Sequence, residues 1–472
     1  MLPSGLALGA VSAVVIALAM DQHPTAVVIG DPQSHTPVLS ARRTPEVIAA
    51  PVGERRLVSE FEAWIPLSPP DSCLVVERSG SRQRLFAHNE RQSLAGASTQ
   101  KLVTATALLL AYGPNARLDT MAAASDPVSD GILAGDLYLI GGGDPLLATP
   151  EYAEQLGSPE FLTDASRLAD AIAEAGIRHI EGSVTGDESR YDSARFHPVW
   201  PDRFRPQNVA GPVGALNVSD GVMGFPKDGR LGSALVPPPD PAEYAAAVVT
   251  ELLRQQGVTV DGAPQSGPAP DDAVIIATLE SVPMREITAE MVIYSDNQTA
   301  EMAFKELGVR ELGEGSWDAG AVATENLLNR SGVSLDGVEI VDGSGLSTQN
   351  RITCDLLVDL LNRPDTGPVL LSGLAVAGQS GTLSDRWTDS PIEGRLRAKT
   401  GSVRTVSALA GQAAPAAGGP LTFAYVATVP DPQLISDAQV ALQDSLAEIL
   451  TTYPRNVDLT ALLPANPPGR EG

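Results

Sequence analysis

Ser98 and Lys101 stand three residues apart at the start of a largely apolar stretch, residues 102–110. The apolar run predicts a buried helix. Residues three apart on a helix share a face, so the Lys101 amine would lie beside the Ser98 hydroxyl. A neutral amine there could accept the serine proton, and the helix N-terminus would favour the negative charge that forms. The pair therefore predicts an activated serine nucleophile.

Lysine is rare in this chain. Lys101, Lys227, Lys305 and Lys399 are its four lysines, whereas Lys and Arg together number 32. Arginine does not give up its proton in proteins, but a desolvated lysine can. Because arginine supplies most of the positive charge in this chain, a lysine that occurs in its place is a candidate for chemistry that arginine cannot perform. Two of the four lie in short motifs.

Those motifs are S-x-x-K at 98–101, Ser-Asp-Asn at 295–297 and Lys-Thr-Gly-Ser at 399–402. Each alone has a commoner structural explanation, which is a helix N-cap, a turn or a strand end. Helices are expected over 283–294 and 298–307, on either side of the second motif. The order of the three, at a helix start, in an interhelical loop and on a strand, is the pattern of serine β-lactamases and penicillin-binding proteins.

Composition narrows the function further. The 472 residues are enough for two or three lobes, and 43% hydrophobic with 19% charged residues is typical of a globular protein. A formal charge of -26 argues against nucleic acid as a partner. The chain has no H-E-x-x-H motif and too few cysteines for a Cys-rich zinc site, so we expect no metal and no organic cofactor. Its five histidines form no catalytic motif, which argues against a Ser-His-Asp triad.

The two cysteines allow one disulfide or none. Cys73 lies in a strand-like run and Cys354 in a helix-like run. Buried cysteines without a partner behave as small apolar residues. The sequence therefore predicts two buried, unpaired thiols.

The N-terminal region reads as an export segment. Residues 6–20 are almost uniformly apolar, which is typical of a secretory signal peptide. The basic region that normally precedes such a segment is missing. Residues 1–20 are therefore expected to be either a signal peptide or a membrane anchor that tethers the protein through residues 6–20. Residues 21–54, rich in Pro, Thr, Ser and Ala, read as a tether. Residues 464–472 read as a disordered tail. The expected location is extracytoplasmic, in the cell envelope, either secreted or anchored.

Between these ends the pattern predicts an interrupted domain. Residues 118–281 change to short strands, Gly/Pro turns and helices, which indicates an inserted lobe, and the segments 55–117 and 282–463 would form the main domain around it. The other expected elements are a helix over 55–65, strands over 72–77, 84–87, 395–408 and 421–429, and helices around 356–361 and 436–450.

At about residues 55–463 the chain resembles the low-molecular-mass class C penicillin-binding proteins, the D-alanyl-D-alanine carboxypeptidase/endopeptidase family. Beyond the three motifs, the resemblance rests on longer strings at 135–145, 342–347 and 378–383. The gap between Ser98 and Ser295 also matches the family's inserted lobe. The resemblance implies an α+β fold, in which a β-lactamase/transpeptidase-like lobe with an antiparallel sheet between helix layers carries a large inserted β-rich lobe.

The resemblance also implies catalytic roles. Ser98 would attack the carbonyl between two D-alanines, with Lys101 as its general base. Ser295 would relay the proton to the leaving amine, and Asn297 would hold the substrate amide. Lys399 would supply positive charge near Ser295.

Substrate binding is implied in the same way. The hydroxyls of Thr400 and Ser402 would bind the terminal carboxylate, and Gly401 would let the strand lie along the substrate. The backbone N–H groups of Ser98 and Ser402 would form the oxyanion hole.

Two departures from the family pattern concern specificity. Some members place an arginine directly after the Gly-Leu-Ser string, where this chain has Thr348 and the next arginine is Arg351. Members also carry a Trp and an Asp from the insert near the substrate side chain. Trp200 and Asp202 occupy a similar stretch at a different spacing. They are therefore candidates for substrate binding, with a structural role as the alternative.

These residues predict a serine-type D-Ala-D-Ala carboxypeptidase that acts on peptidoglycan stem peptides through an acyl-enzyme. Endopeptidase activity would be an additional property, and β-lactam antibiotics would act as inhibitors. The alternatives are a serine β-lactamase and a non-catalytic penicillin-binding sensor.

Overall fold

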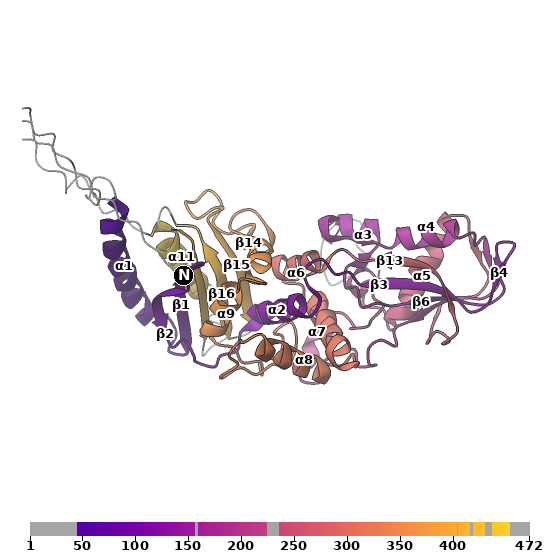
Figure 1. The fold of residues 1–472 in the computed structure, drawn as a ribbon, viewed down its shortest axis with the longest axis horizontal. Helices are drawn as coiled ribbons and strands as arrows, with labels where there is room; N and C mark the ends of the chain where they lie inside the picture. Colours follow the sequence, from indigo (N-terminus) through magenta and orange to yellow (C-terminus); the bar gives the residue numbers. More distant parts are fainter. Residues whose placement is uncertain are drawn as a thin grey trace, which may run out of the picture. The chain divides into compact units, whose positions relative to one another are not determined.

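The computed structural model describes residues 45–155, 159–223, 236–403, 405–415, 419–429 and 437–453 (Figure 1). The expected export segment, most of the tether and the tail lie outside these ranges. Within them, no helix combines the length and the apolar character needed to cross a membrane.

The first helix, α1 (Pro45–Trp64), begins inside the segment predicted as a tether. Proline fits the first position of a helix because its missing N–H would be unsatisfied there anyway. Glu and Ala follow directly, and both have good helix propensity. The predicted start at residue 55 was therefore too late, although the apolar side expected of this helix, Leu57, Phe61 and Trp64, is buried.

A six-stranded antiparallel sheet forms the centre of the main lobe, in the order β14-β15-β16-β17-β1-β2. Strand β1 pairs with β17, with Cys73 opposite Val426, so strands from both ends of the sequence lie side by side. The strands are β1 (Ser72–Arg78), β2 (Gln83–His88), β14 (Ala375–Val376), β15 (Leu396–Val403), β16 (Val406–Ala413) and β17 (Leu421–Thr428).

The prediction of one strand over 395–408 was wrong, because the chain reverses between β15 and β16. The two strands pair from Val403–Val406 to Leu396–Ala413. The turn contains no Gly, Pro, Asn or Asp, the residues that normally indicate a hairpin. The sequence therefore gave no sign of the turn, and the alternation of residue types read as one continuous strand.

Helices cover both faces of the sheet (Figure 1). On one face Leu74 and Phe423 pack with Phe61 of α1 and Leu446 of α11 (Asp437–Thr452). On the other face Val75 and Val426 belong to a core that includes most of the remaining helices of this lobe. These are α2 (Gln100–Tyr112), α6 (Met284–Ile293), α7 (Asn297–Leu312), α8 (Trp317–Arg330), α9 (Cys354–Leu361) and α10 (Gly367–Ser372).

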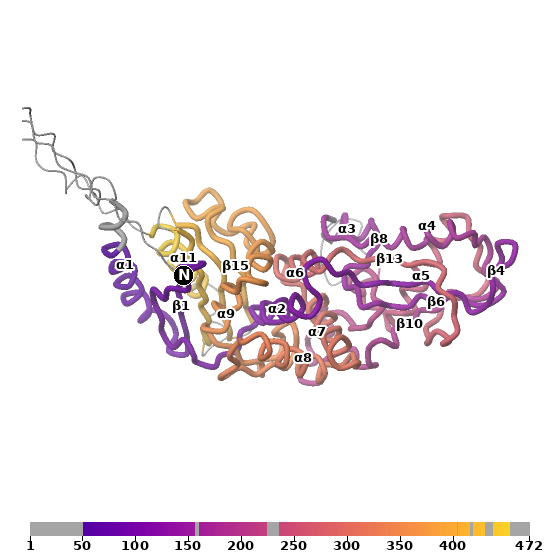
Figure 2. Tube along the Cα trace, viewed as in Figure 1, coloured from indigo at the N-terminus to yellow at the C-terminus, as the bar shows by residue number. Residues whose placement is uncertain are grey.

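Residues 119–280 build separate sheets with a core of their own (Figure 2). A five-stranded sheet has the order β12-β10-β6-β3-β13, and a four-stranded one has the order β11-β9-β5-β4. The strands are β3 (Asp119–Ala124), β4 (Val128–Ser129), β5 (Ile132–Leu133), β6 (Leu137–Ile140), β7 (Leu147–Ala148), β8 (Thr163–Asp164), β9 (His179–Ile180), β10 (Val184–Asp187), β11 (Thr259–Val260), β12 (Gln265–Ser266) and β13 (Val274–Glu280). The helices are α3 (Pro150–Gln155), α4 (Ser166–Glu174) and α5 (Pro241–Gln255).

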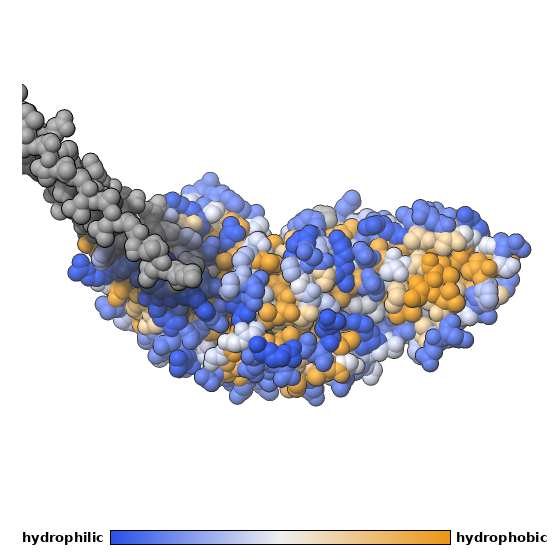
Figure 3. Space-filling view, in the orientation of Figure 1, coloured by the Kyte–Doolittle hydropathy of each residue, from blue (hydrophilic) through white to orange (hydrophobic). Residues whose placement is uncertain are grey.

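Part of this segment's surface is apolar. Figure 3 shows apolar residues gathered over the inserted segment, and its exposed large apolar side chains include Ile132, Val274 and Ile275. Val274 and Ile275 lie on β13, which is an edge strand of the five-stranded sheet.

Cys73 of β1 and Cys354 of α9 form a disulfide, with their Cα atoms 6.0 Å apart. The prediction of two unpaired thiols was therefore wrong. Both residues are fully buried in the core between the sheet and α9. Their separation of 281 residues along the chain left no local sign of this proximity.

The disulfide should contribute substantially to stability. A cross-link across so long a loop restricts the unfolded chain, and its removal typically costs about 2 to 5 kcal/mol. We expect a Cys73→Ala/Cys354→Ala variant to lose that much free energy of unfolding in urea titrations. Reductant should lower the stability of the wild type and leave the variant unchanged. Equal stability of the oxidised wild type and the variant would contradict the assignment.

Candidate active site

Ser98 lies in a short 3-10 turn, Ala97–Thr99, directly before α2. Ala97 has a φ of 46°, which is unusual for a residue with a side chain and stores strain that the surroundings must hold. A Cβ at Gly96 would overlap the buried Ile352 side chain, which would have to move to admit any other residue before this turn. The turn leaves Ser98 partly exposed at the start of the helix.

The amine of Lys101 is held by three acceptors. Its Nζ lies 3.2 Å from Ser98 Oγ, 2.7 Å from Asn297 Oδ1 and 2.9 Å from Ser344 O. The lysine is fully buried. A neutral amine in this position can accept the proton of the Ser98 hydroxyl.

Both lysines of the motifs have lowered pKa values. Burial lowers the pKa of Lys101 to about 8, although negative charges nearby, Asp296 first among them, act in the opposite direction. Burial lowers the pKa of Lys399 well below its ordinary value, and repulsion from the charge of Lys101 adds to this. The charged and neutral forms of the Lys101 amine are therefore balanced near pH 8, well below the pH at which an exposed lysine loses its proton.

The S-x-N motif forms the tight turn between α6 and α7. Ser295 adopts the left-handed conformation with a φ of 63°, and Asn297 begins α7. The Asn297 Nδ2 donates to Val209 O at 2.6 Å. This bond fixes the orientation of the amide, so that its Oδ1 faces Lys101.

The carbonyl that orients Asn297 belongs to the inserted segment. In that segment Pro212 O accepts hydrogen bonds from Gln298 Nε2 at 3.1 Å and from Asn217 Nδ2 at 2.9 Å. Residues 209–217 therefore contact the start of α7. Sequence reasoning missed Val209 because a backbone carbonyl has no residue-type signature.

Strand β15 runs beside the Ser98 turn. A Cβ at Gly401 would lie 2.8 Å from Gly96 O and 3.3 Å from Thr99 N, so glycine permits this close approach. The Lys399 side chain is fully buried, and its Nζ donates to Thr400 O at 2.9 Å. The strand thus brings the K-T-G-S motif against the turn that carries Ser98.

The carboxylate-binding candidates lie where one side of β15 is open. Strand β14 pairs only with Arg397 and Ala398, so from Lys399 onward the described strands leave this edge unpaired. Ser402 is exposed, and Thr400 Oγ1 donates to Thr382 Oγ1 at 3.1 Å. Thr382 lies in the 378–383 string but was not singled out as a site residue.

The 342–347 string is folded around the buried carboxylate of Asp342. This carboxylate accepts the N–H groups of Gly345 at 2.8 Å and Ser347 at 2.6 Å. The loop is thereby held with the Ser344 carbonyl directed at Lys101.

The two candidates from the insert, Trp200 and Asp202, differ in their surroundings. Trp200 is buried, and its Nε1 donates to Asp342 Oδ2 at 2.8 Å. Its ring packs edge-on against Trp317. Trp200 therefore supports the loop from behind, whereas Asp202 is exposed at the start of a short 3-10 helix, Asp202–Phe204.

Buried carboxyl groups lie behind the S-D-N turn. Burial, followed by repulsion from Asp296, raises the pKa of Asp220 to about 8 and that of Glu290 well above its ordinary value. The Tyr152 hydroxyl donates to Asp220 Oδ2. Burial therefore favours the protonated form of both carboxyl groups.

We expect Asp220→Asn to stabilise the protein at pH 8. The folded-state pKa of about 8 exceeds the ordinary value of 3.8, so the unfolded chain releases this proton first and wild-type stability falls as pH rises between the two values. Asparagine does not titrate and can still accept from Tyr152. The gain should be at least about 1 kcal/mol at pH 8 and should shrink toward pH 4. Urea unfolding at both pH values measures it, and a gain independent of pH would contradict the assignment.

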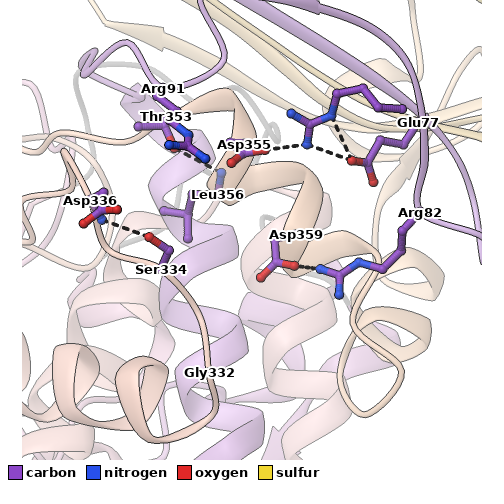
Figure 4. A pocket seen from close by; sticks show the side chains of 11 residues that line it. Glu77, Arg82, Arg91, Gly332, Ser334, Asp336, Thr353, Asp355, Leu356 and Asp359 are labelled. Atoms are coloured by element: carbon purple, nitrogen blue, oxygen red, sulfur yellow. Dashed lines mark hydrogen bonds and ion pairs between the residues drawn. The ribbon is translucent and has the colours of Figure 1, made fainter.

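A charged pocket of about 410 Å³ lies between β2 and α9 (Figure 4). Two of its three arginines are paired with carboxylates, Arg82 with Asp359 and Arg84 with Glu77 and Asp355. None of the residues with predicted catalytic or binding roles lines this pocket. Its paired charges indicate a structural role in joining β2 to α9.

Comparison with known proteins identifies related chains. The family model of the D-Ala-D-Ala carboxypeptidase 3 (S13) family matches residues 66–230 and 222–451. A D-alanyl-D-alanine carboxypeptidase of Actinomadura sp. (strain R39) is 30% identical over 456 residues, which cover 81% of each chain.

Solved structures show the same fold. Penicillin binding protein 4 of Haemophilus influenzae, which has also been solved with a β-lactam, matches with a TM-score of 0.67 at 20% identity, over 83% of this chain and 99% of its own. A peptidoglycan endopeptidase of Bdellovibrio bacteriovorus matches with a TM-score of 0.52 at 18% identity, over 82% and 94%. The predicted fold class is confirmed.

Proposed function

The chain belongs to the D-Ala-D-Ala carboxypeptidase 3 (S13) family, and from this premise we propose that it is a serine-type D-Ala-D-Ala carboxypeptidase acting on peptidoglycan stem peptides. The resemblance inferred from the sequence is confirmed. The observation that carries the proposal is the position of Lys101 Nζ, 3.2 Å from Ser98 Oγ and 2.7 Å from Asn297 Oδ1. This arrangement joins two of the three motifs at the Lys101 amine, beside the Ser98 hydroxyl.

In acylation, the neutral amine of Lys101 takes the proton of Ser98 while Oγ attacks the carbonyl carbon between the two D-alanines. The C–N bond breaks, and the departing amine of D-alanine takes up a proton relayed through Ser295. Water then attacks the acyl-enzyme ester, which releases the shortened peptide as a carboxylate and returns the proton to Ser98. Asn297 holds the substrate amide during both steps.

Substrate binding uses the open edge of β15. The hydroxyls of Thr400 and Ser402 bind the terminal carboxylate, and the N–H groups of Ser98 and Ser402 stabilise the oxyanion, where the loss of one donor typically costs about 3 kcal/mol. In the free protein Lys399 has a lowered pKa. A bound carboxylate favours its charged form, so substrate binding itself supplies the positive charge near the site.

The peptidase domain comprises residues 55–117 and 282–463, and the insert at 118–281 contributes the carbonyl of Val209 to the catalytic turn. The enzyme works outside the cytoplasm, in the cell envelope, as a secreted or N-terminally anchored protein. The buried disulfide supports this location because oxidising compartments preserve such bonds. Activity on cross-linked stem peptides is a further property to be measured.

Purified protein with a peptide ending in D-Ala-D-Ala and with fluorescent penicillin tests the proposal. We expect release of D-alanine, and stable labelling that blocks this release. Rapid hydrolysis of penicillin without a lasting label would indicate a β-lactamase. Labelling without cleavage of either a linear or a cross-linked peptide would indicate a penicillin-binding sensor, and either result would overturn the proposal.

A further inference from the structure

Glu301 is a fully buried carboxylate one helical turn beyond Asn297 on α7. Residues four apart on a helix lie on the same side, so both residues face the same region of the site. A buried carboxylate is costly unless neighbouring donors satisfy it, and its surroundings therefore show what it supports.

The Glu301 side chain binds the backbone of the 342–347 loop. Its Oε1 accepts the N–H of Ser344 at 2.8 Å. Its Oε2 accepts the indole N–H of Trp317 at 2.7 Å and the N–H of Gly343 at 3.3 Å. Three donors thus converge on one carboxylate.

The same loop residue connects Glu301 to the general base. Ser344 donates its N–H to Glu301 and presents its carbonyl to Lys101 Nζ at 2.9 Å. Helix α7 therefore reaches the amine by two routes, directly through Asn297 and indirectly through Glu301 and Ser344.

Glu301 also acts on Lys101 through its charge. Burial raises the pKa of Glu301 to about 7, with repulsion from Asp342 as a second cause, so the carboxylate is ionised at the pH where Lys101 titrates. Its charge raises the pKa of Lys101 against the effect of burial. The other titratable groups around the two residues include three carboxyl groups, Asp296, Asp342 and Glu290, whose ionised forms also raise the pKa of Lys101. The amines of Lys399 and Lys305 lie within electrostatic reach as well.

We propose that Glu301 is a positioning residue for the general base, which directs the Ser344 carbonyl at Lys101 and supplies negative charge behind the amine. The proposal rests on the role of Lys101 given above. It assigns a function to a side chain that does not touch the nucleophile.

The test compares Glu301→Gln with Glu306→Gln by the pH dependence of penicillin acylation and of D-alanine release. In the wild type, kcat/KM should rise with pH to a plateau, with a midpoint near the Lys101 pKa of about 8. Without the charge of Glu301 the midpoint should move down by about one pH unit. The plateau should fall about tenfold, as expected when a general base is misplaced.

Glu306 is the matched control. It lies on the same helix, is fully buried and is bonded to Arg190 and Tyr112. Glu306→Gln should lower the unfolding temperature and leave the midpoint in place. An unmoved midpoint in Glu301→Gln as well would overturn the proposal, because loss of stability alone would then explain the variant.

Glu301→Asp separates the effect of the negative charge from the effect of the hydrogen bonds that the longer side chain makes. It keeps the negative charge on a shorter side chain, so the midpoint should stay near that of the wild type while the plateau falls. A wild-type plateau in this variant would overturn the positioning role, even if Glu301→Gln does not fold. Failure of the proposed function would differ, because the wild type itself would then release no D-alanine.

Discussion

Ser98→Ala is expected to lower the release of D-alanine by about 10⁴-fold or more, because removal of a catalytic nucleophile costs at least this much in serine hydrolases. Ser98 is partly exposed, and its hydroxyl accepts a hydrogen bond from Lys101, so the variant should fold like the wild type. Turnover of a D-Ala-D-Ala peptide measures the loss. The unfolding temperature serves as the control for folding.

The same variant should take up no fluorescent penicillin. Labelling at the wild-type level would show that another residue is the nucleophile. Retained turnover without labelling would show that the peptide reaction does not use an acyl-enzyme at Ser98.

Lys101→Arg is expected to lower the acylation rate by about 10² to 10⁴-fold, the usual contribution of a general base. Arginine keeps the positive charge but cannot become neutral, whereas burial brings the pKa of Lys101 down to about 8. The residual rate should therefore lack the rise between pH 7 and pH 9 expected of the wild type. Stopped-flow acylation by a chromogenic cephalosporin measures both features.

Lys101→Met, which keeps the apolar stem, is the control for packing. It should acylate as slowly as the arginine variant. An arginine variant within tenfold of the wild type, with an unchanged pH profile, would exclude Lys101 as the base.

The parts of the site that could be predicted are those specified by residue type and short spacing. Ser98 lies in the 3-10 turn that leads directly into α2, and across this continuous helical stretch a spacing of three residues places Lys101 beside it. A strand with glycine at 401 permits close approach of another backbone, and the structure places the Ser98 turn there.

Other contributions have no such signature. Val209 acts through its carbonyl, which every residue possesses. Glu301 would be read from the sequence as part of a solvated helix face, and only the packing of α7 against the 342–347 loop shows that it is buried. Such roles depend on contacts between distant segments, which periodicity does not encode.

The disulfide illustrates the same limit in the fold. The flanks of Cys73 and Cys354 correctly indicated a strand and a helix, and both residues are buried. Pairing required knowing that α9 packs on β1, which is a long-range contact. Two apolar environments are equally consistent with free thiols.

The central claim is that the three motifs serve one hydroxyl, that of Ser98. Its most direct test is to incubate the protein with benzylpenicillin, digest it and locate the covalent adduct by mass spectrometry. The predicted result is one penicilloyl group on the Ser98 hydroxyl. An excess of D-Ala-D-Ala peptide, added before the penicillin, should prevent this adduct from forming. An adduct on any other residue, or turnover that continues while Ser98 is fully modified, would contradict the account.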